Sequence, residues 1–141
     1  MDISSLKKDP KTISSGVWIG DIPGMGDLRL HVRGMTSPLY IATFNRLARA
    51  APGDQRDRTG TVTPEASIIL AGRAIHETVL LDWDGLTSDG EPVPYSSDLA
   101  LEWLTDPDYI AGDNTFADAV VFAAKVVDKS LAKTAKVIGK N

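Results

Sequence analysis

Two neighbouring residues, His76 and Glu77, are the first candidates for chemistry in this chain. A histidine followed by a glutamate on a helix begins the zinc-protease motif, in which a second histidine four residues after the first completes the metal site. That position is Leu80 here, and the only other histidine of the chain is His31. The sequence therefore predicts no histidine metal site, and an ordinary histidine on a helix flank is the favoured interpretation of His76.

The acidic run between residues 82 and 91 is a second candidate, because it could bind calcium or supply a pair of catalytic carboxylates. An EF-hand loop needs acids at positions one, three and five, a glycine at six and a glutamate at twelve. Aligning Asp89 and Gly90 with positions five and six puts a glycine, a threonine and a serine where three ligands are required. Aspartates that form turns are therefore favoured, and a small enzyme that uses this loop is the weakest alternative.

The remaining motifs supply no catalytic or cofactor site. Gly20, Gly24 and Gly26 do not follow the dinucleotide fingerprint, and they lie between two predicted strands. Gly139 and Lys140 have no second glycine upstream at phosphate-loop spacing, and the chain contains neither a Gly-x-Ser-x-Gly elbow nor a cysteine. We therefore expect a protein that is not an enzyme and that needs no cofactor or metal.

Composition limits the class of protein further. The 141 residues are enough for one domain with a core of its own. A formal net charge of −4, without a dominant basic stretch, argues against a nucleic-acid partner. The absence of cysteine fits a reducing compartment. Because no signal peptide is visible and the apolar runs are far shorter than the roughly 20 residues that span a bilayer, we expect a soluble intracellular protein without a membrane partner.

The first elements along the chain predict a β-hairpin. Residues 16–20 are rich in β-formers, and residues 21–26 contain a proline and two glycines, which favour a turn. The next segment, 28–33, alternates apolar and polar side chains, which is typical of a strand with one buried face. The inward residues of that strand are expected to be Leu28, Leu30 and Val32.

Helices are predicted for most of the remaining chain. Ser37-Pro38 and Thr63-Pro64 each combine an N-cap residue with proline at the first helical position. The first of these helices is ended by Pro52-Gly53, and a solvated loop follows over residues 54–61. The second is expected to run to about Leu81. Its most apolar line is predicted to be Ile68, Gly72, Ile75 and Val79.

Two more helices complete the prediction. One is capped by Ser96 or Ser97 and runs through Leu104, and the last and longest begins at one of three possible caps in residues 113–115. The last helix has more apolar surface than a single amphipathic face requires. Two interpretations remain open: the helix is buried on several sides, or one line packs the core while the other binds a partner. The candidate partner-binding residues lie on these two lines: Phe116, Val120, Val127 and Leu131 form one, and Val121, Phe122 and Val126 form the other.

Between the second and third of these helices lies a connector over residues 80–95. Two Asp-Gly pairs and two prolines prevent a helix from running through it. Its large apolar side chains are spaced so that a tightly turned loop can place several of them on one core, which predicts a structured connector. The residues expected to form it are Trp83, Asp84, Gly85, Leu86, Asp89, Gly90 and Tyr95.

The same stretch carries a resemblance to a known family. The Asp-Trp-Asp-Gly-Leu run at 82–86, the Asp89-Gly90 turn, and Pro-Val-Pro-Tyr-Ser at 92–96 before a short helix resemble tail assembly chaperones of long-tailed, siphovirus-like bacteriophages. The similarity covers residues 16–50 and 81–104. It implies a non-enzymatic protein of the infected bacterial cytoplasm that is absent from the mature virion.

The resemblance also implies partners. A tail assembly chaperone binds the phage tape measure protein and assists assembly of the tail tube, and family members often have a longer form, made by a frameshift, that involves the tail-tube protein. A homo-oligomer is a further expectation. The alternative is a structural virion component, such as a head–tail connector or a tail-terminator subunit.

For the fold, we expect an α+β protein, a mainly helical single domain with an N-terminal β-hairpin and about four helices. The domain is expected over residues 15–136. A flexible tail is predicted for 1–14 and a flexible end for 137–141.

Overall fold

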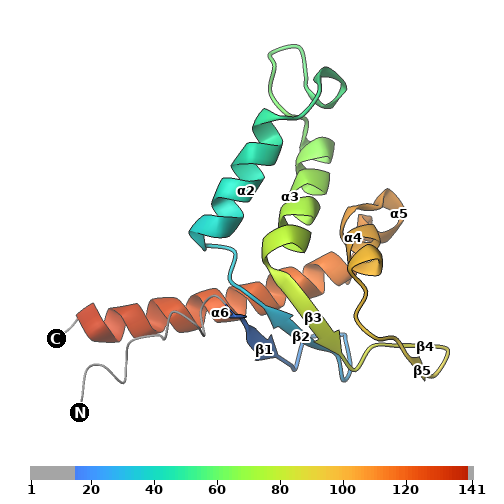
Figure 1. Cartoon of the computed structure of the whole chain (residues 1–141), viewed down its shortest axis with the longest axis vertical. Helices are drawn as coiled ribbons and strands as arrows, with labels where there is room; N and C mark the ends of the chain where they lie inside the picture. The colour runs from blue at the N-terminus through green and yellow to red at the C-terminus, as the bar shows by residue number, and fades with distance from the viewer. Residues whose placement is uncertain (1–14, 140–141) are drawn as a thin grey trace.

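The computed structural model describes the backbone of residues 15–139 and the side chains of residues 15–130 (Figure 1). In this part of the chain, five α-helices accompany a three-stranded and a two-stranded antiparallel sheet. The predicted α+β class is therefore confirmed. The two outermost stretches, 1–14 and 140–141, lie outside the described residues, so their expected flexibility stays a prediction.

The larger sheet has the strand order β1-β2-β3. Strands β1 (Val17–Ile19) and β2 (Arg29–Val32) form the predicted hairpin, with Ile19 opposite Leu30. The inward residues Leu30 and Val32 are buried, as the alternation predicts, and so is Leu28 just before the strand.

The third strand, β3 (Leu80–Asp84), was not predicted. The expected end of the second helix near Leu81 is wrong, because that helix ends at Thr78 and residues 80–84 pair with β2 instead. A bulge in the pairing adds one residue between Leu80 and Asp82, which breaks simple alternation. Leu80 and Trp83, three positions apart, therefore both reach the core.

Helices α2 (Pro38–Arg49) and α3 (Pro64–Thr78) are antiparallel and project from the sheet as an arm (Figure 1). Both predicted caps are confirmed: Ser37 Oγ accepts from the Tyr40 N–H, and Thr63 Oγ1 accepts from the Ala66 N–H. The arm has its own small core. Its members are Leu47, Leu70 and Ala74, with Tyr40, Phe44, Ala48, Ala51 and Val62 packed against them.

One residue of the predicted apolar line of α3 is misplaced. Ile75, Val79 and Gly72 are buried, but Ile68 is 57% exposed. A Cβ at Gly72 would overlap the carbonyl oxygen of Leu104, so α3 touches the C-terminal end of the next helix at this point. Ile68 lies one turn further along the arm, past that contact, and is left in solvent.

The loop at the tip of the arm contains the short 3-10 helix η2 (Gly53–Gln55). The guanidinium group of Arg56 donates to the carbonyl oxygens of Ala48, Ala51 and Gly60, which ties this loop to the end of α2. Hydrogen bonds from Thr59 and Thr61 lower the pKa of the Asp57 carboxyl. The predicted solvated loop is thus exposed and is held by local hydrogen bonds.

The connector continues from β3 into a small hairpin of β4 (Thr87–Ser88) and β5 (Glu91–Pro92). Asp89 and Gly90 at its tip have φ angles of 51° and 81°. Positive φ at both central residues is the geometry that favours an Asp-Gly turn between antiparallel strands.

Helix α4 (Ser97–Thr105) begins at the cap Ser96, and Asp106 ends it. Asp106 also caps the short helix α5 (Pro107–Ile110), which the sequence analysis did not predict. The last helix, α6 (Phe116–Gly139), runs past residue 136, the expected end of the domain. Its first turn is closed by reciprocal bonds between Thr115 and Asp118.

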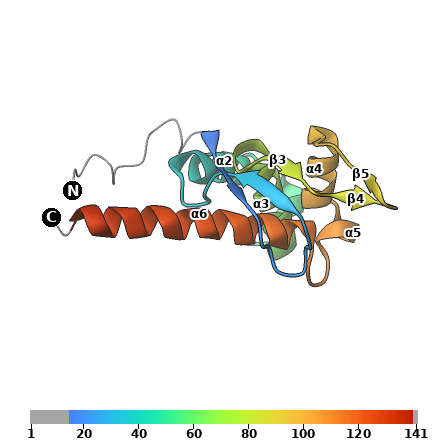
Figure 2. The ribbon, with the colours of Figure 1, turned by 90° about the horizontal axis from the view of Figure 1, so that it is seen from below.

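Helix α6 lies across one face of the larger sheet, and its C-terminal part extends beyond it (Figures 1 and 2). The main core sits between this helix, the sheet, α3 and α4. Its largest fully buried side chains outside the arm are Leu30, Val32, Val79, Leu104 and Val120.

Candidate functional site

Helix α6 presents two different apolar lines. Val120 and Val127 are buried against the sheet, and Phe116 is half-buried. On the opposite side, Phe122 is 38% exposed and Val126 is 36% exposed. The sequence analysis placed Phe116, Val120, Val127 and Leu131 on one line and Val121, Phe122 and Val126 on the other, without deciding which line faces the core. The structure leaves Phe122 and Val126 as the part of the candidate set that a partner can reach.

Two members of the candidate set, Val121 and Leu131, do not belong clearly to either side of α6. Val121 is half-buried and packs against the main core, so it lies at the border between the two lines. Leu131 belongs to the helix, but its side chain lies outside the described residues. The exposed face of α6 is accordingly defined here by Phe122 and Val126 with the neighbouring Asp118, Lys125 and Lys129, which are all exposed.

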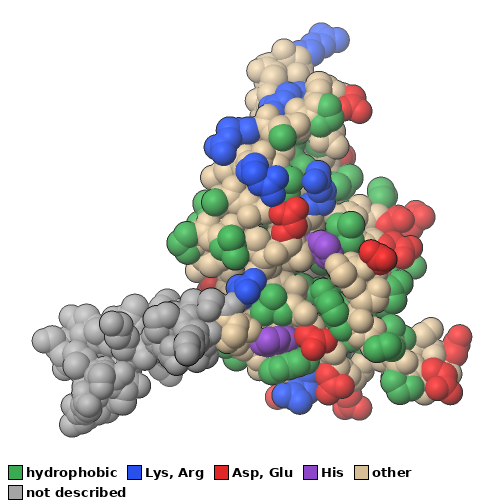
Figure 3. Space-filling view, viewed as in Figure 1, with side chains coloured by type: hydrophobic (Ala, Val, Ile, Leu, Met, Phe, Trp, Pro, Cys, Tyr) green, Lys and Arg blue, Asp and Glu red, His purple; other side chains and the backbone are tan. Residues whose placement is uncertain are grey.

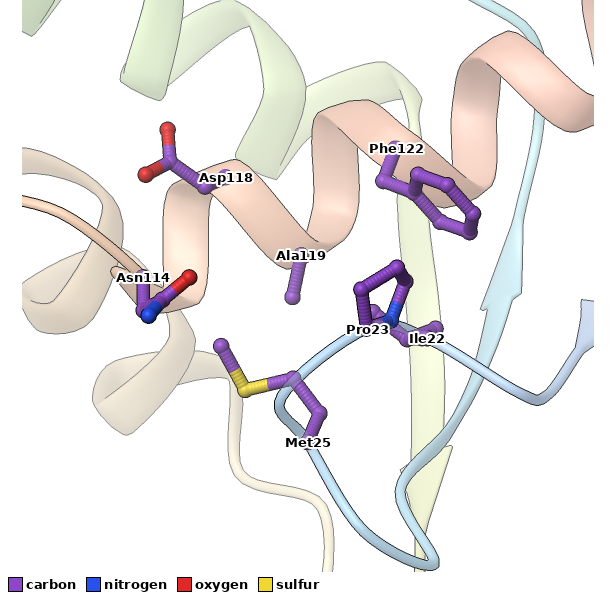
Figure 4. Close-up of a pocket in the computed structure, with 7 residues that line it drawn as sticks. All are labelled: Ile22, Pro23, Met25, Asn114, Asp118, Ala119 and Phe122. Carbon is purple, nitrogen blue, oxygen red and sulfur yellow. The ribbon is translucent and has the colours of Figure 1, made fainter.

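A hollow of about 180 Å³ adjoins Phe122 (Figure 4). It lies between α6 and the β1–β2 loop. Pro23 and Phe122 border one end of it, and Met25 and Asn114 the other (Figure 4). Its lining residues are Ile22, Pro23, Met25, Asn114, Asp118, Ala119 and Phe122.

The β1–β2 loop is shaped to meet α6. The Met25 N–H donates to the Ile22 carbonyl, and Leu28 N–H donates to the Met25 carbonyl. Between them Gly24 has a φ of 75°, a conformation that favours glycine. The sequence indicated only a turn here, although Ile22 and Met25 are unusually apolar for one. These apolar turn residues were the available sign that the loop contributes to a surface.

The size of the hollow indicates what it can hold. Pockets for small-molecule ligands usually measure roughly 300–1,000 Å³. The hollow is smaller, about 180 Å³, and mostly apolar in its lining residues. One apolar side chain of a protein partner fits such a space better than a cofactor does. An exposed apolar line beside a side-chain-sized hollow is a typical arrangement for helix binding.

The charge along the exposed face of α6 is uneven. Asp118 lies near its start, while Lys125 and Lys129 lie further along. The Asp128 carboxylate faces the base of the arm, where it accepts hydrogen bonds from the Met35 N–H and from the N–H and hydroxyl of Thr36. The C-terminal part of the described face is therefore apolar with basic neighbours.

The connector lies on the other side of this helix, around Trp83. Trp83 is 4% exposed, and its Nε1–H donates to the Val93 carbonyl at 2.8 Å. Its ring centroid lies 4.9 Å from that of Tyr95, 5.2 Å from Trp103 and 5.6 Å from Phe116. Burial, together with the nearby Asp82 carboxylate, raises the pKa of the Tyr95 hydroxyl. The connector thus joins β3 and α4 to the start of α6.

The other connector residues lie around this cluster. Leu86 is half-buried and packs against the core, and Asp84 is exposed. A Cβ at Gly85 would overlap the Asp27 carbonyl oxygen, so a glycine is required for that close approach. Asp89 and Gly90 form the β4–β5 turn.

The two histidines, which were the first candidates for chemistry, lie in different parts of the molecule. His76 Nε2 is 3.0 Å from both the carbonyl and the hydroxyl oxygen of Ser97, which links α3 to the start of α4. His31 stacks on Trp18 on the outer face of the sheet, with centroids 5.0 Å apart. Among the described residues, no group of three or more His, Cys, Asp or Glu side chains is placed to hold a metal ion. None of the described helices is long and apolar enough to cross a membrane.

Comparison with known proteins identifies the origin of the chain. Residues 35–141, about three quarters of it, match the model of a family of proteins encoded by prophages. That family is described as YdaY prophage protein, and this chain belongs to it. It is therefore a phage-derived protein. No curated protein and no solved structure matches the chain.

The family match covers the arm, β3, the connector and α6. Strands β1 and β2 and the loop between them lie outside the matched range. The exposed face of α6 thus lies within the matched part, whereas Ile22, Pro23 and Met25 on the other wall of the hollow do not.

Proposed function

We propose that this protein is a phage tail assembly chaperone that binds the tape measure protein and assists tail-tube assembly, without catalysis. Three findings support the proposal: membership of a prophage protein family, the resemblance of residues 82–96 to such chaperones, and the exposed face of α6. The observation that carries it is the exposure of Phe122 and Val126 on a helix whose opposite line already fills the core.

The proposed mode of binding is helix against helix. A tape measure protein is long, helical and prone to aggregate, so a chaperone for it must offer apolar surface that its own fold leaves unfilled. An amphipathic partner helix would lay its apolar face along Phe122 and Val126 and insert one side chain into the hollow. Lys125 and Lys129 beside this line would favour acidic residues on the polar flank of that helix.

The cellular setting follows from the same proposal. The chaperone acts in the cytoplasm of the infected bacterium and leaves before the virion is complete. A longer form produced by a frameshift would recruit the tail-tube protein. If the protein is instead found in purified particles at a fixed ratio to tail subunits, it is a structural virion component, such as a head–tail connector or a tail-terminator subunit.

Co-expression with the tape measure protein of the same prophage tests the proposal. Wild-type protein is expected to keep the tape measure protein soluble and to co-purify with it. Phe122→Asp and Val126→Lys should each reduce the recovered complex about tenfold or more, since central apolar contacts dominate such interfaces. Circular dichroism and melting temperature of the isolated variants should stay as in the wild type, because both side chains are exposed.

Ile68→Asp is the matched control. Ile68 is an exposed apolar helix residue as well, but it lies on the arm, away from α6. It should co-purify like the wild type. Full recovery of the complex with both α6 variants, or equal loss with all three, would reject the α6 face as the binding surface.

A further inference from the structure

Helices α2, α3 and α4 form a row in which α3 is the middle member. Helix α3 contacts α2 on one side and α4 on the other (Figure 1). The close approach at Gly72 fixes α4 against α3, and the arm core fixes α2 against it. Within residues 15–139, the two outer edges of the row, the α2 edge and the α4–α5 edge, lie on opposite sides of the molecule, and no further helix of the row covers them.

The α2 edge is apolar at its base and basic toward the tip of the arm. Ile41 is 49% exposed although it is a large apolar residue, and Arg49 lies about two turns after it on a similar face of α2. Leu39, 51% exposed, is two positions from Ile41 and therefore lies on another side of the helix. Arg46 and Arg49 follow on the same helix, which contains no acidic residue. Arg46 does pair with Glu77 of α3 at 2.9 Å, but both side chains are largely exposed, and such surface pairs are weak.

The α4–α5 edge has the opposite charge. Leu101 of α4 and Tyr109 of α5 are exposed apolar residues. Asp98 lies one turn before Leu101 on α4, Glu102 lies one turn after Asp98, and all three side chains are exposed. The chain between Arg73 and Lys125 contains no lysine or arginine at all, so no basic side chain of α4 or α5 offsets these carboxylates.

The separation of charge is visible on the surface. Figure 3 shows basic side chains along the arm and acidic side chains, mixed with apolar ones, on the side of α4 and α5. We propose that the α2 edge of one molecule docks on the α4–α5 edge of a second copy of this chain. Apolar residues meet at the centre of this contact, and Arg49 faces Asp98 and Glu102 of the neighbouring copy.

Charge also selects this pairing over a symmetric one. Two α2 edges facing each other bring arginines together, and two α4–α5 edges bring carboxylates together, so a two-fold contact of either kind is repulsive. The mixed contact is heterologous, and each molecule keeps one free edge of each type after binding. Copies therefore associate head to tail. The exposed face of α6 takes no part and stays open, so the inference does not depend on the proposed function.

A mixing experiment with the full chain tests this arrangement. Wild-type protein should associate with rising concentration in sedimentation velocity, and more weakly at high ionic strength. Ile41→Asp blocks the α2 edge and Leu101→Asp blocks the α4–α5 edge. Each variant alone should remain monomeric, with a dissociation constant raised at least about tenfold. A mixture of the two retains one intact contact and should form a one-to-one dimer and nothing larger.

Control variants distinguish this contact from loss of folding and from non-specific hydrophobic association. Ile68→Asp removes an apolar residue of α3, outside both edges, and should associate like the wild type. Arg49→Glu changes the α2 edge and Glu102→Lys changes the α4–α5 edge. Both side chains are exposed, so these variants can be used if Ile41→Asp or Leu101→Asp fails to fold. Mixed together, these two charge reversals should restore association. A wild-type protein that stays monomeric, variant mixtures that do not associate, or an equal effect of Ile68→Asp would overturn the proposal.

Discussion

Replacing Trp83 by alanine tests whether the connector is part of the core. The indole is 4% exposed, its Nε1–H donates to the Val93 carbonyl, and three aromatic rings lie within 5.6 Å of its centroid. Truncating a buried tryptophan costs about 3–5 kcal/mol of unfolding free energy. We expect Trp83→Ala to fall in the upper part of that range, because it also leaves the Val93 carbonyl without its hydrogen-bond donor. Since small domains have a total stability of about 5–15 kcal/mol, the variant should be close to unfolding.

Urea unfolding followed by far-ultraviolet circular dichroism measures this loss. Trp18→Ala is the matched control, because Trp18 is 39% exposed and its ring stacks on His31 and contacts Arg29. Surface contacts of these kinds contribute about 1 kcal/mol. A loss of under about 1 kcal/mol for Trp83→Ala, or one no larger than that of Trp18→Ala, would refute the placement of Trp83 in the core.

Three further changes test other contacts. Asp128→Ala removes the acceptor for three donors at the base of the arm and should cost about 1–3 kcal/mol in urea unfolding, whereas Lys129→Ala should be neutral. Gly72→Ala forces α3 away from Leu104 and should cost about 1–3 kcal/mol, while Gly53→Ala, which points into open space, should not; equal effects would contradict the close approach. Adding EDTA or calcium should leave the melting temperature unchanged. A shift of several degrees would indicate that the acidic connector binds a metal ion.

Local signals predicted much of the fold. Serine or threonine before proline identified the starts of α2 and α3, and alternation identified the buried face of β2. These features depend on a few neighbouring residues, so they can be read from the sequence. Strand β3 depends on pairing with β2 about fifty residues away, and its bulge hides the alternation of Leu80 and Trp83. Its assignment therefore needed the tertiary structure.

The candidate surface was predictable only in outline. The excess apolar width of α6 could be seen from the sequence, but which line faces the core depends on where the sheet lies. Phe122 and Val120 differ by two positions and have opposite environments for that reason. The hollow joins α6 to a loop about one hundred residues earlier, and no local pattern links Pro23 to Phe122. The exposure of Ile68 likewise follows from where α4 ends.

Site-specific photocrosslinking tests the central claim most directly. A photoreactive benzoylphenylalanine is placed at Phe122, and in parallel at Ile68 and Ile41, in protein co-expressed with the tape measure protein. If the exposed face of α6 binds the partner helix, Phe122 should yield the chief crosslink to the tape measure protein, and the two arm positions should yield little. Crosslinks to the tape measure protein from Ile68 or Ile41 without one from Phe122 would contradict binding by α6.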